Sequence, residues 1–310
     1  MTGTIPLAAL LAEAQARLQS ANLSFGHGTT NARDEAAWLV LWRLGLPLDS
    51  DLQALAAHPV APDAAAAVRA LIEERIRTRK PAAYLTGEAW LQGVPFYVDE
   101  RVIVPRSLIA EPIAAAPQAD PIDPWLGPHT RRVLDLCTGN GSLAVLAALA
   151  WPDVTVDAAD ISADALAVAE RNVARHGLQG RIRLLQSDGW CAITQRYDLI
   201  LCNPPYVNRQ TLAALPAEYR AEPVLALDGG DDGMDFVRHL LARAEAHMND
   251  DAVLVLEIGH ERAHFERAFA HLAVEWLHTS GGPDAVLLIT RAALAAARET
   301  LPPDPKRCAP

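Results

Sequence analysis

The chain has 310 residues, a length that corresponds to about two domains. Hydrophobic residues make up 51% of the chain and charged residues 21%, so it can bury a core and global disorder is excluded. The formal net charge of −11 argues against a protein that grips nucleic-acid phosphates through a basic face. An acidic chain suits a basic protein substrate instead.

The sequence lacks the signals of secretion, membrane insertion and metal binding. The N-terminus has no basic region ahead of an apolar one, so we predict no signal peptide. No apolar run approaches the roughly 18 residues that cross a bilayer, and we expect a cytoplasmic protein with no membrane partner. The four cysteines form no CxxC and no His-spaced pattern, so no metal site is predicted.

The first part of the chain predicts a helical domain followed by a hairpin. Residues 1–80 carry apolar residues at helical spacing, and we expect this domain to dock the substrate, the alternative being that it only adds stability. Residues 81–130 differ, because Gly and Pro separate short β-prone pieces and a Pro-rich stretch follows. We interpret them as a β-hairpin and an irregular linker, with strands predicted over residues 89–91, 96–98 and 101–104.

Residues 131–291 alternate between strands and helices, the pattern of an α/β doubly wound sheet with helices on both faces. Gly281-Gly282 separates the last two strands, which predicts an antiparallel pair at the end of the domain. Residues 292–310 form a C-terminal tail. The predicted strands cover residues 132–136, 154–158, 182–185, 197–201, 252–258, 274–277 and 285–290.

Ligands bind at the carboxyl ends of strands in such sheets, and three of these ends carry polar residues. The first strand ends near Asp135 in a turn of small residues, whose glycines let the backbone approach a ligand. Asp160 ends the second strand, where a carboxylate can accept both ribose hydroxyls. Asp188 follows the third strand, where it can accept from an adenine amino group. The turn itself is Cys137-Thr138-Gly139-Asn140-Gly141.

Two cofactor classes fit these strand ends, because NAD and S-adenosylmethionine sites share the glycine turn and the acidic residue after it. The fourth strand decides between them, since it ends in the tetrapeptide Asn203-Pro204-Pro205-Tyr206. The two prolines make the backbone rigid where it leaves the strand, and the Asn203 side chain can hold a planar group that bears an NH2. A dehydrogenase has no evident use for that arrangement.

The tetrapeptide suits methyl transfer to a planar nitrogen. The lone pair of an amide nitrogen is delocalised, so the nitrogen is a poor nucleophile. The Asn203 side-chain oxygen and the Pro204 carbonyl can accept from both N–H groups, which favours the positive charge that develops on nitrogen. Tyr206 or Val207 can pack on the planar group. By itself the tetrapeptide does not choose a glutamine amide over a nucleic-acid base.

Residues 135–141 and 203–206 together resemble the HemK family of class I S-adenosylmethionine-dependent protein-glutamine methyltransferases. The resemblance covers residues 80–290 and includes the segment from Phe96 to Ser107. Within this family one branch modifies peptide chain release factors, and another modifies the large-subunit ribosomal protein L-three. The turn Pro105-Arg106-Ser107-Leu108-Ile109-Ala110-Glu111 and residues 218–223 are more similar to the ribosomal-protein branch.

The resemblance implies N5-methylation of a glutamine side chain in that ribosomal protein, with S-adenosylmethionine as methyl donor and S-adenosylhomocysteine as product. The alternatives are methylation of a release factor, methylation of a base amino group, and a non-catalytic protein that binds the cofactor and docks on ribosomal precursors. The net charge argues against the base, and no sequence-specific nucleic-acid binding is expected. The implied catalytic residues are Asn203, Pro204, Pro205 and Tyr206, and the implied cofactor contacts are Asp135, Cys137, Thr138, Gly139, Asn140, Gly141, Asp160, Ile161, Asp188, Gly189 and Asn203.

Two further features of the sequence bear on the site. Members of this family often place an aromatic or apolar residue directly after the third-strand Asp, against the adenine. Here Gly189 holds that position and Trp190 follows, and the sequence leaves open which of them lines the adenine pocket. Residues 207–232 form a long insertion after the tetrapeptide, which we expect to lie over the active site as a substrate-gripping lid.

Overall fold

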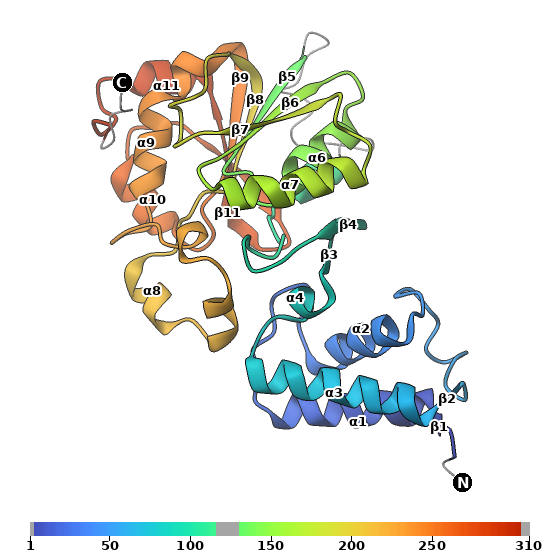
Figure 1. The fold of residues 1–310 in the computed structure, drawn as a ribbon. Helices are drawn as coiled ribbons and strands as arrows, with labels where there is room; N and C mark the ends of the chain where they lie inside the picture. Colours follow the sequence, from blue (N-terminus) through green and yellow to red (C-terminus); the bar gives the residue numbers. More distant parts are fainter. Residues whose placement is uncertain (1–2, 116–129, 305–310) are drawn as a thin grey trace.

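The structure, a computed structural model, describes residues 3–115 and 130–304. Figure 1 shows a group of N-terminal helices below the sheet, with a hairpin between the two. The N-terminal helices pack their apolar faces on one core, and two short antiparallel strands lie beside them. These elements are α1 (Leu7–Ser20), α2 (Ala32–Leu44), α3 (Pro62–Thr78), β1 (Ile5–Pro6) and β2 (Pro59–Val60).

A short helix and a hairpin connect the helices to the sheet, namely α4 (Ala82–Thr86), β3 (Glu88–Leu91) and β4 (Val94–Tyr97). The strand predicted over 101–104 is wrong. The Asp99 side chain accepts from the backbone N–H of Arg101, and the N–H of Val102 donates to the Asp99 carbonyl, so the chain turns there. Helix α5 (Ala110–Ala115) follows, and most of the predicted Pro-rich linker lies outside the described residues.

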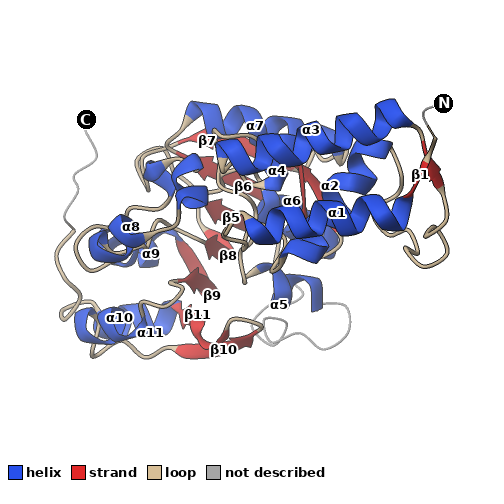
Figure 2. Ribbon diagram, turned by 90° about the horizontal axis from the view of Figure 1, so that it is seen from below, coloured by secondary structure: helices blue, strands red, loops and turns tan. Residues whose placement is uncertain are grey.

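The sheet has seven strands in the order β10-β11-β9-β8-β5-β6-β7, which confirms the predicted fold class (Figure 2). Strand β11 runs antiparallel to both β9 and β10, and the other neighbours are parallel. The strand order reverses between β5 and β8, the place where open α/β sheets bind ligands. The strands are β5 (Arg132–Leu136), β6 (Thr155–Asp160), β7 (Ile182–Gln186), β8 (Tyr197–Cys202), β9 (Met248–Glu257), β10 (Glu275–Thr279) and β11 (Gly282–Thr290).

Alternate residues of the strands face two separate apolar layers. Val133 and Leu199 pack on one side with α5 and α6, whereas Leu134 and Ile200 pack on the other with α9, α10 and α11. Figure 2 shows these two groups of helices on opposite sides of the sheet. The helices are α6 (Ser142–Ala150), α7 (Ala163–Arg175), α9 (Asp235–Ala244), α10 (Arg262–Ala268) and α11 (Arg291–Ala297).

The insertion that follows β8, residues 207–232, contains only short helices and no strand of the sheet. It contains α8 (Arg209–Ala214) and two short 3-10 helices, η2 (Ala217–Ala221) and η3 (Val224–Ala226). A third 3-10 turn, η4 (Glu245–His247), precedes β9. Within residues 3–115 and 130–304, no helix has the length and apolar content that crossing a membrane requires.

Candidate functional site

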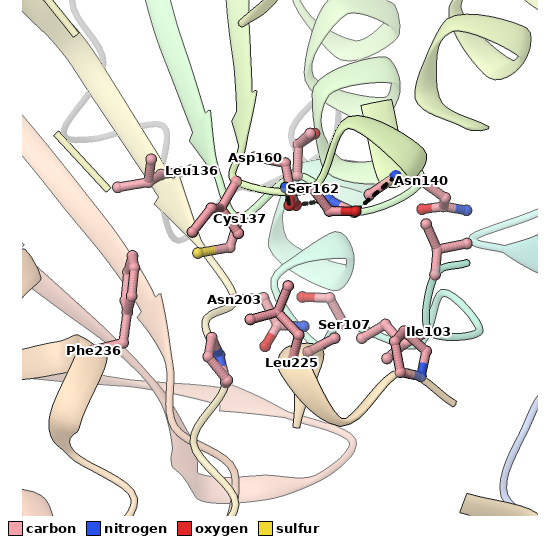
Figure 3. Close-up of a pocket in the computed structure, with 18 of the residues that line it drawn as sticks. Ile103, Ser107, Leu136, Cys137, Asn140, Asp160, Ser162, Asn203, Leu225 and Phe236 are labelled. Carbon is pink, nitrogen blue, oxygen red and sulfur yellow. Dashed lines mark hydrogen bonds between the residues drawn. The ribbon is translucent and has the colours of Figure 1, made fainter. Parts of the chain in front are cut away.

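A cavity of about 330 Å³ lies at the carboxyl ends of the parallel strands (Figure 3). Small-molecule sites begin at about this size. The cavity brings together most of the residues that the sequence singles out. The predicted residues in its wall are Cys137, Thr138, Gly139, Asn140, Asp160, Ile161, Asp188, Gly189, Asn203 and Pro205.

The register of the central strands explains this convergence. Leu136 of β5 lies opposite Cys202 of β8, so the chain leaves both strands at the same level, into Cys137 and Asn203. On the other side of β5, Leu136 lies opposite Ala159, one residue before Asp160. Parallel strands therefore place the glycine turn, the acidic residue and the tetrapeptide at one edge.

The Asp160 carboxylate holds the glycine turn in place. Its Oδ2 accepts from the backbone N–H of Gly139 at 2.9 Å, and its Oδ1 accepts from the N–H of Ser162 at 2.9 Å. Each carboxylate oxygen has a second lone pair, so Asp160 can still accept two ribose hydroxyls. Burial raises the pKa of this carboxyl. Asp160 thus shapes the turn and offers the acceptors that the sequence predicts.

One asparagine within the turn and one that bonds to it from α7 add to the site. Asn140 lies in the cavity wall and is buried, and its Nδ2 has no hydrogen-bond partner among the described residues. A buried donor without a partner calls for an acceptor, which the carboxylate of an amino-acid moiety would supply. Asn172 of α7 donates from Nδ2 to the Asn140 carbonyl at 2.8 Å and accepts from the N–H of Tyr97 at 2.7 Å. It ties the turn to hairpin strand β4.

Asp135 lies outside the cavity wall and is 1% exposed. Its Oδ2 accepts from the Thr138 hydroxyl and from the N–H of Ala144, so it braces the turn and the start of α6. Burial raises the pKa of Asp135 to about 7. The predicted contact between Asp135 and the cofactor remains a prediction. Gly141 and Pro204 also stand behind the wall rather than in it.

Gly189, and not Trp190, lines the cavity. The Trp190 side chain is buried in the core, where its Nε1 donates to the Leu240 carbonyl and its ring stacks on His247 at 4.6 Å. The cavity has an aromatic wall nonetheless, because Phe236 of α9 lines it. Phe236 is a cavity residue that the sequence did not indicate, since it follows Asp188 by 48 residues.

Replacing Gly189 with alanine should destabilise this side of the cavity. Gly189 has φ +54°, and a Cβ there would lie 2.3 Å from Nε2 of the buried His239. We expect Gly189→Ala to lower the free energy of unfolding by about 1–3 kcal/mol and to weaken cofactor binding. Chemical denaturation and calorimetric titration of S-adenosylhomocysteine measure the two effects. Gly177→Ala, also at positive φ (+67°) but in open space, is the matched control and should lose stability without losing affinity.

Of the tetrapeptide residues, Asn203 lies in the cavity wall and Tyr206 lies outside it. Asn203 lies in the cavity wall, and its side-chain amide has no hydrogen-bond partner among the described residues, so it is available to a ligand. Tyr206 is not in the wall, and its hydroxyl donates to Glu257 Oε1 at 3.1 Å. Gly233 and Gly259 leave room for the Tyr206 backbone and ring, because a Cβ at either would lie within 2.5 Å of them. The predicted packing of Tyr206 on the substrate remains a prediction.

The insertion covers part of the cavity, as a lid would. Pro223, Leu225, Ala226 and Asp228 lie in the cavity wall. Leu225 and its neighbour Val224 are nevertheless 59% and 60% exposed, so the rim carries an apolar surface next to Asn203. The insertion therefore forms one wall of the site and can contact whatever enters it.

Two buried glutamates anchor the insertion to the rest of the chain. Glu218 accepts from the N–H of Ser24 and pairs with Arg79 at 2.9 Å, both in the N-terminal region. Glu222 accepts from two nitrogens of Arg106, at 2.6 and 2.7 Å, and from the N–H of Val104 at 2.9 Å. His27 lies 3.6 Å from Glu222 on its other side. The insertion is thus held to the N-terminal region through Glu218 and to the linker segment through Glu222.

Comparison with known proteins agrees with this geometry. A family described as "Methyltransferase small domain" matches residues 123–218. The "Ribosomal protein uL3 glutamine methyltransferase" of Bordetella pertussis is 52% identical over 285 residues, which cover 91% of this chain and 94% of that protein. A protein of the same name from Burkholderia pseudomallei is 52% identical and covers 93% and 95%, and one from Neisseria meningitidis serogroup B is 46% identical and covers 91% and 92%. These matches confirm the resemblance to the ribosomal-protein branch.

Proposed function

We propose that this chain, which belongs to the ribosomal protein uL3 glutamine methyltransferase family, transfers a methyl group from S-adenosylmethionine to a glutamine side-chain amide of large-subunit ribosomal protein uL3. The observation that carries the proposal is the free amide of Asn203 at the rigid end of β8, inside a cavity whose other residues suit a nucleoside. A ribosomal-protein substrate would place the enzyme in the cytoplasm, as the sequence predicts.

The residues of the cavity fit S-adenosylmethionine on chemical grounds. Asp160 offers acceptors for ribose hydroxyls, Asp188 offers an acceptor for the adenine amino group, and Phe236 offers an apolar face to the base. The Asn140 amide offers a donor to the amino-acid carboxylate. When bound, the cofactor supplies an electrophilic methyl group on a positively charged sulfur.

The chain's own residues act on the acceptor amide. The Asn203 side-chain oxygen and the Pro204 carbonyl accept from the two N–H groups, which holds the nitrogen and stabilises positive charge on it. Pro204 and Pro205 fix the direction of both acceptors, because their φ angles cannot adjust. Pro205 and the insertion residue Leu225 supply apolar wall beside the acceptor amide.

Substrate identity is tested in one competition experiment. The protein is incubated with isotope-labelled S-adenosylmethionine, purified uL3, release factor and ribosomal RNA, and mass spectrometry locates the label. We expect N5-methylglutamine in uL3 only. Label on the release factor alone would assign the chain to the other branch of the family, and label on RNA alone would refute protein-glutamine methylation.

Asp160→Asn should weaken cofactor binding with little effect on folding. The amide is isosteric and can still accept from Gly139, but it loses one acceptor and the negative charge that face the ribose. Hydrogen bonds to charged groups contribute about 1.5–3 kcal/mol, so we expect the Kd for S-adenosylhomocysteine to rise about 10- to 100-fold in calorimetric titration. Asp157→Asn, in the same strand but outside the cavity wall, should leave this Kd unchanged.

A further inference from the structure

A buried carboxylate stands directly behind the substrate side of the cavity. Glu257, the last residue of β9, is 3% exposed. Its Oε2 accepts from the Ser107 hydroxyl at 2.6 Å and from the N–H of Leu108 at 2.9 Å, and its Oε1 accepts from the Tyr206 hydroxyl at 3.1 Å. No cation of the described residues forms an ion pair with it. Burying a carboxylate without a cation beside it costs free energy, so a role in function would explain why Glu257 is buried here.

The hydroxyl of Ser107 is oriented by this carboxylate. A serine hydroxyl has one proton and two lone pairs, and a carboxylate can only accept, so the proton of Ser107 points at Glu257. The N–H of Ile109 donates to the same hydroxyl oxygen at 3.3 Å and occupies one lone pair. Ser107 also lies in the cavity wall, as Asn203 does (Figure 3). The Ser107 oxygen therefore has one lone pair left for a ligand in the cavity, and toward that ligand Ser107 is an acceptor.

We propose that Ser107 is a catalytic residue of the methyl transfer, which accepts the proton released by the methylated nitrogen while its own proton passes to Glu257. This role rests on the proposed function. Asn203 and Pro204 hold the amide and stabilise charge, but neither an amide oxygen nor a peptide carbonyl can carry a proton away. Ser107 with Glu257 is a route for that proton which begins in the cavity and ends on a carboxylate.

The step balances in atoms and charge. The lone pair of the glutamine nitrogen forms a bond to the methyl carbon, the carbon–sulfur bond breaks, and sulfur keeps the electron pair. The nitrogen, now positively charged, loses a proton to the Ser107 oxygen, and the Ser107 proton moves to Glu257 Oε2. The products are a neutral N-methylamide, a neutral serine and a protonated Glu257, which releases its proton to solvent before the next turnover.

The surroundings of Glu257 suit a group that holds a proton between steps. Burial raises the pKa of its carboxyl, against the lowering effect of its hydrogen bonds from Ser107 and Tyr206. The same carboxylate joins the linker turn at Ser107 to the tetrapeptide at Tyr206. Glu257 is therefore also a positioning residue, because it sets the two chain segments that flank the substrate amide relative to each other.

The test compares Ser107→Ala, Ser107→Thr and Glu257→Gln with the unmodified protein. Steady-state kinetics on uL3 give kcat and KM, calorimetric titration of S-adenosylhomocysteine gives the cofactor Kd, and thermal unfolding checks the fold. General acid–base groups contribute typically 10²–10⁴-fold, and because the methylated nitrogen is already acidic we expect kcat to fall about 100-fold in Ser107→Ala and Glu257→Gln. The cofactor Kd should not change, and Ser107→Thr, which keeps the hydroxyl, should restore most of kcat.

Ser280→Ala is the matched control. The Ser280 hydroxyl also donates to a carboxylate, that of Glu111, but at a site away from the cavity wall, so its loss should leave kcat unchanged. If Ser107→Ala keeps full kcat and raises the cofactor Kd, Ser107 is a cofactor contact and the proposed role is wrong. If only Glu257→Gln loses kcat, the carboxylate acts on Tyr206 alone and the role is equally wrong. If the unmodified protein methylates no glutamine of uL3, the proposed function itself fails.

Discussion

Replacing Asn203 with alanine is expected to abolish most methyl transfer while cofactor binding survives. Its side chain is the free amide of the tetrapeptide and lies in the cavity wall. Under the proposed function, the truncation removes an acceptor for an N–H group of the substrate, where positive charge develops as the bond to carbon forms. Removing one such electrostatic contact lowers kcat by about 10²–10³-fold. Steady-state kinetics on uL3 and calorimetric titration of S-adenosylhomocysteine measure the two properties.

The control for this prediction is Asn249→Ala. Asn249 near the start of β9 donates to Asp198 at 2.6 Å, at the opposite end of the sheet from the cavity, so its loss should leave kcat unchanged. A fall in cofactor affinity as large as the fall in kcat would instead assign Asn203 to the cofactor. A variant that methylates normally would exclude the proposed amide acceptor.

Replacing Glu222 with glutamine is expected to have the largest effect on stability. Glu222 is fully buried at its side chain, and the Arg106 side chain that it binds is about one-quarter exposed. Burial opposes ionisation, but His27 and Arg106 outweigh it and lower the pKa of Glu222 to about 2 from its ordinary value of 4.5. A difference of this size corresponds to about 3 kcal/mol of folding free energy at neutral pH.

The sign of the pH dependence follows from the lowered pKa. The Glu222 contribution is complete above about pH 4.5, where the unfolded chain is also ionised, and is lost as the pH falls toward 2. Urea unfolding of the unmodified protein and of Glu222→Gln should therefore differ by about 3 kcal/mol at pH 7, and the curves should converge on acidification. Activity should fall too, because the neighbouring Pro223 lies in the cavity wall.

An exposed glutamate supplies the comparison. Glu13 binds Arg69 with similar geometry, but both side chains are more than one-third exposed, so water and salt screen the pair. Glu13→Gln should change the stability little at any pH. Equal effects of Glu222→Gln and Glu13→Gln would show that burial is irrelevant to the contribution of Glu222, and curves that diverge on acidification would contradict the lowered pKa.

The strand-end residues of the cavity could be predicted because the sequence signals that mark them are local. A glycine turn, an acidic residue at the end of the next strand, and a rigid Asn-Pro-Pro each depend on a few adjacent residues. Strand periodicity then places all three at one edge of a parallel sheet, which the register of β5 with β6 and β8 bears out. The one wrong strand, over residues 101–104, failed because the Asp99 side chain offers the backbone a turn instead.

The buried carboxylates around the cavity could not be predicted, because their contacts join segments that are far apart in the chain. Ser107 and Glu257 are separated by 150 residues, and the Val104 N–H and Glu222 by 118. In the sequence Glu218, Glu222 and Glu257 look like ordinary surface charges, since nothing within a few residues reveals that they are buried. A buried carboxylate is stable only where donors from other elements meet it, and folding alone determines where those donors lie.

By itself, then, the sequence determined the fold class, the edge of the sheet at which the cavity lies, and the place of Asn203 in the cavity wall. Only the tertiary structure decided that Gly189 and Phe236 line the cavity, that Trp190 and Tyr206 do not, and that the Ser107 hydroxyl in the cavity wall donates its proton to Glu257. The physical reason is the range of the interactions: backbone rigidity and strand period act over neighbouring residues, whereas the direction of a hydroxyl proton is set by a carboxylate from a distant strand.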